Sequence, residues 1–228
     1  MKKDWDVIVT GSEGYLGKFV FNSLSNSGLN VVGLDTALGN DLENEDFVIN
    51  WFKDNRGKNL INLFGLNDHV TDKNIQNKSL EVSLATFRDF LELNVTTLFS
   101  VCRNYIKNND SGNILNFSSI YGINSPKPKL YSNMEKHIGY GVSKSSVIQL
   151  TKHLAVHYGP AFRANSIVLG GVLNNQSIEF VTSYSNEVPL GRMATREDVA
   201  GLVEFLVSEK AKYFSGSAIV LDGGWSAT

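Results

Sequence analysis

The 228-residue chain is 42% hydrophobic and carries a net charge of −2, which indicates one good core and gives no electrostatic basis for binding nucleic acid or an anionic membrane. No apolar run approaches the roughly 18 residues of a membrane-spanning helix, and the opening MKKDWD is unlike a signal peptide. Cys102 is the only cysteine, which excludes a cysteine-ligated zinc site, and His153 and His157 lack an evident third ligand, so no metal is expected. We predict a single cytoplasmic domain over residues 1–228.

The N-terminal segment has the order strand, glycine-rich turn and helix. An apolar strand is expected near 5–10 and a helix near 15–27, with Gly11, Gly14 and Gly17 at and after the turn. Gly11 permits the tight turn, Gly14 lets the backbone approach a pyrophosphate, and Gly17 lets helix and strand pack closely. An ordinary tight turn is the alternative. The residues expected to contact a dinucleotide here are Gly11, Ser12, Glu13, Gly14, Tyr15, Leu16 and Gly17.

Asp35 ends the next expected strand, near 30–35. A carboxylate at this point accepts hydrogen bonds from the adenosine ribose hydroxyls and repels a 2′-phosphate. Neither Arg nor Lys follows it directly, and Glu13 adds negative charge in the turn. The sequence therefore favours NAD over NADP, although Asp35 could also be a simple turn residue.

The rest of the chain continues to alternate between strands and helices, which predicts an α/β fold with a doubly wound parallel sheet of the Rossmann type, in three α/β/α layers. Ligands of such sheets bind beyond the carboxyl ends of the strands, so Asn62, Ser119 and Gly170 should converge on one crevice. Further strands are expected near 58–64, 112–118, 162–169 and 217–222, and helices near 84–108, 139–158 and 195–208.

Tyr140 and Lys144, in the run GYGVSK, are the strongest candidates for catalysis. Four residues of helix bring two side chains onto one face. A cation about 5 Å from a phenol favours the phenolate by roughly 3 kcal/mol at an effective dielectric of about 20, or about two pKa units. The pair is therefore suited to general acid–base chemistry.

Several segments together resemble the short-chain dehydrogenase/reductase family, over nearly the whole chain. The resemblance lies in TGSEGYLG, in Asp41-Leu42, in NLFG at 62–65, in FLELNVTTLF around Asn94, in NILNFSSIYG, in RANSIVLGGV, and in PLGRMATREDVAGLVEFLVSE followed by FSGSAIVLDGGW. It implies that Tyr140 exchanges a proton with the substrate, that Lys144 lowers the tyrosine pKa and binds the nicotinamide ribose, and that Ser119 polarises the substrate oxygen. It also implies that Asn94 fixes a water next to Lys144. The cofactor contacts that it adds are Asp41, Leu42, Asn62, Leu63, Phe64, Gly65, Tyr140, Lys144, Gly170, Gly171 and Val172.

The sequence also departs from the family pattern. The glycine spacing is more usual in the sugar-nucleotide branch, and Asp35 is so close to Asn62 that the usual helix and third strand must be shortened. Leu63 and Phe64 are bulkier than the family residues, and Gly170 replaces a proline, which is expected to loosen its loop.

We therefore expect an NAD(H)-dependent oxidoreductase that interconverts a secondary alcohol and a ketone. Two polar segments, 121–139 and 172–190, should determine the substrate, and their composition suits a sugar or sugar nucleotide of surface-glycan biosynthesis. The alternatives are an epimerase or dehydratase that retains NAD, and a non-catalytic NAD-binding module. The resemblance also implies a homodimer or homotetramer, with a small polar substrate and no nucleic-acid or membrane partner.

Overall fold

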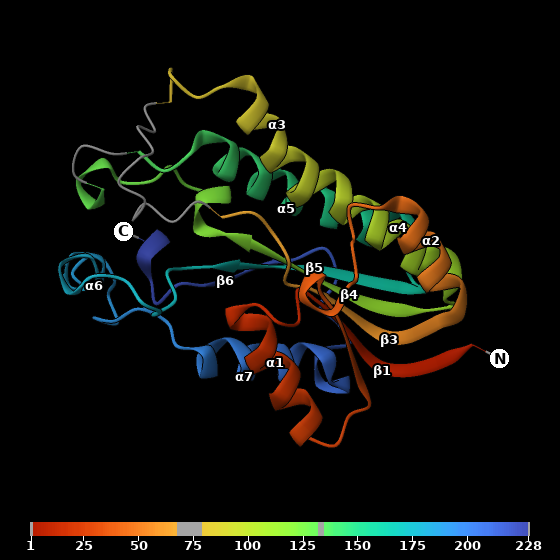
Figure 1. Ribbon diagram of the computed structural model, residues 1–228. Helices are drawn as coiled ribbons and strands as arrows, with labels where there is room; N and C mark the ends of the chain where they lie inside the picture. Colours follow the sequence, from red (N-terminus) through yellow and green to blue (C-terminus); the bar gives the residue numbers. More distant parts are fainter. Residues whose placement is uncertain (1, 68–78, 132–134, 228) are drawn as a thin grey trace.

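The computed structural model describes residues 2–67, 79–131 and 135–227, and these form one parallel sheet of six strands in the order β2-β1-β3-β4-β5-β6 (Figure 1). All neighbouring strands run parallel, so their carboxyl ends share one edge. The strands are β1 (Lys3–Thr10), β2 (Val31–Leu34), β3 (Asn55–Asn62), β4 (Gly112–Ser119), β5 (Phe162–Leu169) and β6 (Ala218–Leu221).

Helices cover both faces of the sheet, and the predicted doubly wound α/β/α fold is confirmed (Figure 1). α1 and α7 lie together on one face, and α2, α4 and α5 lie on the other with α3. The helices are α1 (Tyr15–Asn26), α2 (Glu45–Asp54), α3 (Leu84–Leu91), α4 (Leu98–Asn108), α5 (Ile138–Tyr158), α6 (Ile178–Ser185) and α7 (Arg196–Val207).

Along each central strand, the side chains alternate between the hydrophobic cores on the two faces of the sheet. Val7 and Val9 pack towards α1 and α7, against Leu24 and Val203, while Ile8 joins the cluster of the opposite face. This is the alternation of side chains along a pleated strand. Both cores are fully enclosed, which explains why these strands read as continuous apolar runs in the sequence.

The connection from β2 to β3 differs from our expectation. We predicted a shortened helix and a shortened third strand, but this fully described stretch holds only the 3₁₀ turn Thr36–Leu38 and helix α2. The chain crosses directly from the edge strand β2 to β3, on the far side of β1. The stretch has room for one crossover helix and not for an additional strand with its own connection.

Two helical segments also differ from the sequence prediction. The helix expected over 84–108 is divided by a π-helical turn at Glu92–Thr97, and α6 lies within the segment that we had assigned only as a cover for the site. Ser177 caps α6 by accepting a hydrogen bond from the Phe180 amide.

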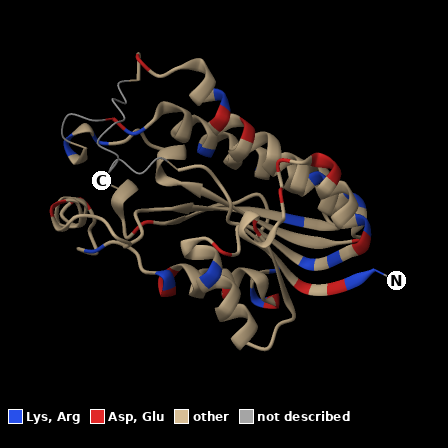
Figure 2. Cartoon of the chain, viewed as in Figure 1, with Lys and Arg blue, Asp and Glu red and all other residues tan. Residues whose placement is uncertain are grey.

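Charged residues of both signs are interspersed in Figure 2, and several lie on β1 and β3 at the amino edge of the sheet. There Lys58 pairs with Asp6 at 2.8 Å, and Arg56 pairs with Asp110. In the part of the chain that the structure describes, no helix has the length and apolar character needed to cross a membrane.

The glycine-rich turn brings α1 into direct contact with the end of β1. Gly11 has a φ of 71°, and a Cβ placed on it would lie 2.5 Å from the Phe64 amide nitrogen. A Cβ on Gly17 would lie 1.9 Å from the Gly11 carbonyl oxygen. The expected role of Gly17 in close packing is thus visible, because any side chain there would separate the helix from the turn.

A Gly17→Ala substitution should therefore lower the free energy of unfolding by at least about 3 kcal/mol, because the obstructing atoms are backbone. Gly201→Ala is the matched control: Gly201 lies in α7, and a Cβ added to it would have no neighbouring atom within 4 Å, so alanine should stabilise the protein by about 0.5–1 kcal/mol. Urea denaturation of both variants tests this, and a Gly17→Ala protein as stable as the wild type would contradict it.

Candidate active site

Two adjoining hollows open at the carboxyl edge of the sheet, a cleft of about 660 Å³ and a smaller hollow of about 300 Å³. Among the predicted site residues, Gly11, Gly14, Tyr15, Leu16, Gly17, Leu63, Phe64, Gly65, Ser119, Tyr140, Lys144, Gly170, Gly171 and Val172 line the larger cleft. Asp35, Asp41 and Leu42 line the smaller hollow, together with Gly11, Gly14 and residues 63–65. The glycine turn is thus shared by both.

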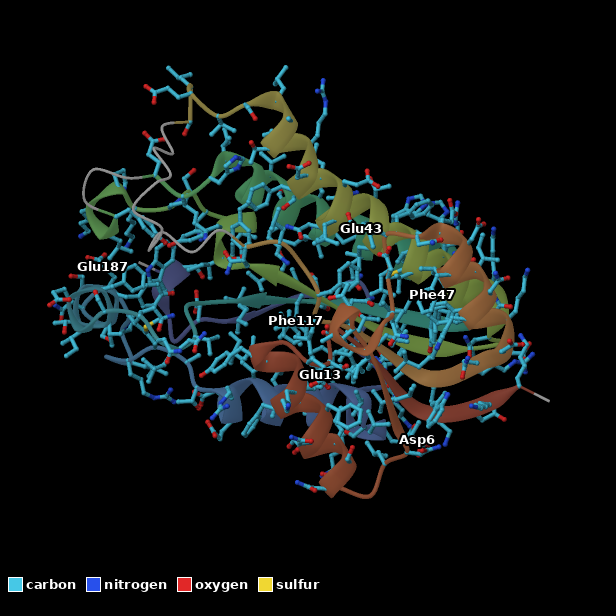
Figure 3. All side chains as sticks on the ribbon, viewed as in Figure 1. Asp6, Glu13, Glu43, Phe47, Phe117 and Glu187 are labelled. Atoms are coloured by element: carbon cyan, nitrogen blue, oxygen red, sulfur yellow. The ribbon has the colours of Figure 1, made fainter. Side chains whose placement is uncertain are left out.

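Four predicted residues do not appear in the described walls of either hollow: Ser12, Glu13, Asn62 and Asn94. The Ser12 side chain is buried against Gly33. Glu13, which Figure 3 labels, forms an ion pair with Lys18. Asn62 and Asn94 are instead buried in hydrogen-bond networks behind the site.

Asn62 is the centre of a ladder of buried polar side chains. The Thr10 hydroxyl donates to Asn62 Oδ1 at 2.9 Å, Asn62 Nδ2 donates to Asn116 Oδ1 at 2.8 Å, and Asn116 Nδ2 donates to the Thr151 hydroxyl at 2.9 Å. The ladder runs across β1, β3 and β4 to α5. The sequence analysis did not detect Asn116 and Thr151, because their pairing depends on strand register.

Asn94 lies in the π-helical turn, where it holds the segment after β3. Its Oδ1 accepts from the Leu66 amide at 2.7 Å, while its Nδ2 donates to the Leu66 carbonyl and to the Ser143 hydroxyl. Ser143 immediately precedes Lys144 on α5. The Asn94 side chain therefore supports the site from behind, and the predicted water beside Lys144 stays a prediction.

Lys144 is almost completely buried and lies at the wall of the larger cleft. Its Nζ donates to the Phe117 carbonyl at 2.9 Å and lies 5.9 Å from the centre of the Tyr140 ring. Phe117 is labelled near the middle of Figure 3. Burial lowers the Lys144 pKa to about 8, because the charged ammonium has lost its hydration. The predicted pair is thus brought together, and the Lys144 pKa lies about one unit above neutral pH.

The two serines at the end of β4 have different surroundings. The Ser118 hydroxyl donates to the Lys144 carbonyl at 2.7 Å, which ties the strand to α5. Both serines line the larger cleft, but the Ser119 hydroxyl accepts from the Tyr121 amide at 3.2 Å and can still donate its own proton. Ser119 is thus the better placed of the two to meet a substrate oxygen.

Asp35 orders the wall of the smaller hollow. One of its carboxylate oxygens accepts from the Glu13 amide at 3.0 Å and the other from the Ala37 amide at 2.9 Å. The oxygen bound by Ala37 also accepts from the Thr36 hydroxyl at 3.5 Å, whereas the oxygen bound by Glu13 keeps a second lone pair that can accept from a ligand. Asp35 therefore acts as a turn cap and also remains available as an acceptor.

Tyr15 joins the two sides of the larger cleft. Its hydroxyl donates to the Leu173 carbonyl at 2.5 Å, and the Arg196 guanidinium lies 5.1 Å from the centre of its ring. The first residue of α1 is thereby linked to the segment after β5. The sequence pattern placed Tyr15 near a cofactor but gave no indication of this contact.

The loop at Gly170-Gly171 is held firmly, so our expectation that it is loosened was wrong. The Gly170 amide donates to the Leu221 carbonyl, a bond that a proline could not form, and the Gly171 amide donates to the Tyr184 hydroxyl at 2.6 Å. A Cβ on Gly171 would lie 2.7 Å from the Tyr184 ring. Glycine is needed here for close approach.

The sequence of the chain matches a family of known proteins. The family model described as "Enoyl-(Acyl carrier protein) reductase" matches residues 36–226. The chain belongs to the short-chain dehydrogenase/reductase family. This confirms the family resemblance.

Among members of the family, the chain is 28% identical to the 3-oxoacyl-[acyl-carrier-protein] reductase FabG of Aquifex aeolicus, over 96% of this chain and 86% of that protein. It is 34% identical to the post-translational flagellin modification protein A of Campylobacter coli, over 53% of this chain. It is 32% identical to the 7alpha-hydroxysteroid dehydrogenase of Paraclostridium sordellii, over 73% of this chain. The alignments span only 48% and 62% of the last two proteins.

The fold of this short-chain dehydrogenase/reductase also matches solved structures. A short-chain dehydrogenase from Leptospira borgpetersenii with bound NAD+ superposes with a TM-score of 0.88 at 26% identity, covering 99% of this chain and 94% of the other.

The burial of Lys144 predicts a dependence of stability on pH. Its pKa is about 8 in the folded protein and 10.5 in the reference state, so between these values the unfolded chain binds more protons and stability rises with pH. Relative to Lys144→Met, the free energy of unfolding of the wild type should rise by about 2 kcal/mol from pH 7 to pH 10. Denaturant unfolding of both proteins at the two pH values measures this. An equal response of both proteins would show that Lys144 is not desolvated.

Proposed function

We propose that this short-chain dehydrogenase/reductase is an NAD(H)-dependent oxidoreductase that interconverts a secondary alcohol and a ketone. The observation that carries the proposal is that Ser119, Tyr140 and Lys144 line one cleft directly beside the glycine turn. A hydroxyl, a phenol and a buried ammonium are the groups that proton transfer to or from a substrate oxygen requires.

The walls of the two hollows fit an extended dinucleotide. Gly14 leaves the turn open, since a Cβ on it would meet only the Gly11 carbonyl, at 3.3 Å. α1 begins at Tyr15, so its first amides and its dipole favour a pyrophosphate at this point. Asp35 and Asp41 present carboxylates to the smaller hollow, which suits ribose hydroxyls and opposes a 2′-phosphate. The Leptospira structure, with its bound NAD+, supports the same choice of cofactor.

The proposed mechanism follows from the chain's own groups. Bound NAD(H) supplies or accepts the hydride. Ser119 donates a hydrogen bond to the substrate oxygen and so holds it beside the Tyr140 hydroxyl. Tyr140 gives the oxygen a proton during reduction and removes it during oxidation, and Lys144 stabilises the phenolate that reduction leaves. Asn94 would fix a water that links Lys144 to solvent.

For the substrate we propose a polar, hydroxylated molecule, such as a sugar or sugar nucleotide. Tyr131, Phe180 and Tyr184 line the larger cleft and provide flat surfaces and hydroxyls, and Asn174 and Gln176 add amides. These groups suit a ring with both apolar faces and polar edges. The partial similarity to a flagellin modification protein supports a role in surface-glycan synthesis.

We also propose that the chain forms a homodimer or homotetramer through α3, α4, α5 and the C-terminal strand. Phe99, Val142 and Val156 are exposed on α4 and α5, and Val220 is exposed on β6. Exposed apolar side chains on neighbouring helices are suited to contact with a second copy. A cytoplasmic location stays a prediction.

Binding of NADH tests the proposed cofactor. Calorimetry should show tighter binding of NADH than of NADPH, and Asp35→Ala should weaken NADH binding by about 10-fold or more, because a hydrogen bond to a charged group is lost. Asp46→Ala removes the same charge from a residue outside the described walls of both hollows and should leave the affinity unchanged. A failure to bind either nucleotide would overturn the proposal.

The two serines provide a test of the chemistry. In a screen of sugars with NAD+, Ser119→Ala should lower kcat by about 100-fold or more, because a group that polarises the reacting oxygen is lost. Ser118→Ala should retain most of the activity and lose about 1 kcal/mol of stability. Comparable losses of kcat in both variants would contradict the assignment of Ser119. Product formation without net production of NADH would instead favour an epimerase or dehydratase that retains NAD.

A further inference from the structure

A second lysine, Lys136, lies against Tyr140. It precedes the tyrosine by four residues, whereas Lys144 follows it by four. Lys136 precedes α5, and its Nζ lies 4.7 Å from the centre of the Tyr140 ring, compared with 5.9 Å for Lys144. Both lysines line the larger cleft with the tyrosine. A cation within about 6 Å of an aromatic ring is attracted to it, and more strongly when the ring carries the charge of a phenolate.

The position of Lys136 is maintained by a contact with the segment after β3. Its Nζ donates to Asn67 Oδ1 at 2.6 Å, and Asn67 also lines the cleft. Asn67 follows Leu66, which is held by Asn94. The same network that supports α5 from behind therefore also holds the segment that receives Lys136.

The two lysines differ in their environment. Lys144 is buried, and desolvation brings its pKa down to about 8, so its charge is lost as the pH rises through that value. Lys136 is only half-buried, and its Nζ donates to Asn67. A tyrosine that depended on Lys144 alone would lose its cation in mildly alkaline solution.

We propose that Lys136 is a second cation of this site, which lies over the Tyr140 ring and stabilises the phenolate form of the tyrosine. The proposal rests on the proposed function. Lys136 acts through Tyr140 and not on the substrate, so it is a positioning residue. The equal spacing of Lys136, Tyr140 and Lys144 along the chain is the signal that could have identified it from the sequence.

Other titratable groups also surround Tyr140. Tyr121 is close enough for its pKa to be raised further by Tyr140, after burial and Tyr131. His137 stacks on Phe90, whose ring meets the Tyr140 ring edge-on. Lys129 and Glu179 line the same cleft. These groups are common to the wild type and to the lysine variants below, so differences between those proteins report the contribution of each lysine.

The direct test is the titration of Tyr140 by NMR in protein labelled with ¹³C at the tyrosine ζ carbon, with the signal assigned by Tyr140→Phe. Lys136→Gln should raise the Tyr140 pKa by about one unit, because a half-screened cation about 5 Å away is removed. Lys136→Arg should restore most of the shift. Lys136→Met, which retains the aliphatic stem on the ring, should behave like Lys136→Gln.

Lys127→Gln is the matched control. Lys127 comes from the same segment and carries the same charge, but it pairs with Glu187 at 2.8 Å, lies over the Trp225 ring and does not appear among the described residues that line the cleft. Figure 3 labels Glu187 on the left of the view, beside α6. Lys127→Gln should leave the Tyr140 titration where it is in the wild type.

An unchanged Tyr140 titration in Lys136→Gln and Lys136→Met, or an equal shift in Lys127→Gln, would overturn the proposal. The NMR titration needs neither substrate nor cofactor. If NADH failed to bind, the proposed function would be overturned, but the effect of Lys136 on the Tyr140 pKa could still be measured. Where a substrate is found, the lower pH limb of kcat/KM for oxidation should move upward by the same amount in Lys136→Gln.

Discussion

A ladder of buried hydrogen bonds fixes the distance between the glycine-rich turn and the helix that carries Tyr140 and Lys144. It runs from Thr10, directly before the turn, through Asn62 and Asn116 to Thr151 of α5. All four side chains are almost completely enclosed, so water cannot replace a missing partner. An unsatisfied buried polar group costs about 1–3 kcal/mol, which makes slippage of one strand against the next unfavourable. The two halves of the site are thereby positioned by the sheet itself and not by surface loops.

The same rigidity allows the fold to hold an ammonium group in its interior. Lys144 has lost its hydration and donates to the carbonyl of Phe117, and Asn94 holds the adjoining segment through Leu66 and Ser143. A lysine whose pKa is about 8 changes its charge close to physiological pH, which a hydrated lysine does not. The burial of the Lys144 ammonium lowers the stability of the fold. The same burial gives the site a group whose charge can change when a proton moves at Tyr140. Lys136, nearer to solvent, would complement it with a charge that depends less on burial.

Much of the fold was predictable from local patterns in the sequence. Apolar runs separated by helical segments gave a parallel sheet, and the glycines at 11, 14 and 17 located the turn because each removes a steric obstacle that the backbone alone defines. The spacing of Tyr140 and Lys144 located the reactive pair because one helix holds both. Features that depend on the distance between remote segments were not predictable. The register that pairs Asn62 with Asn116, the hydrogen bonds that hold Gly170, and the direct crossover from β2 to β3 all belong to this class.

The most direct test of the proposed cofactor site is a crystal structure of the protein grown with NADH. We expect the adenosine in the hollow that Asp35, Asp41 and Leu42 line, the pyrophosphate at the start of α1, and the nicotinamide in the larger cleft beside Ser119 and Tyr140. A nucleotide bound elsewhere, or one whose nicotinamide faces away from Tyr140, would contradict it.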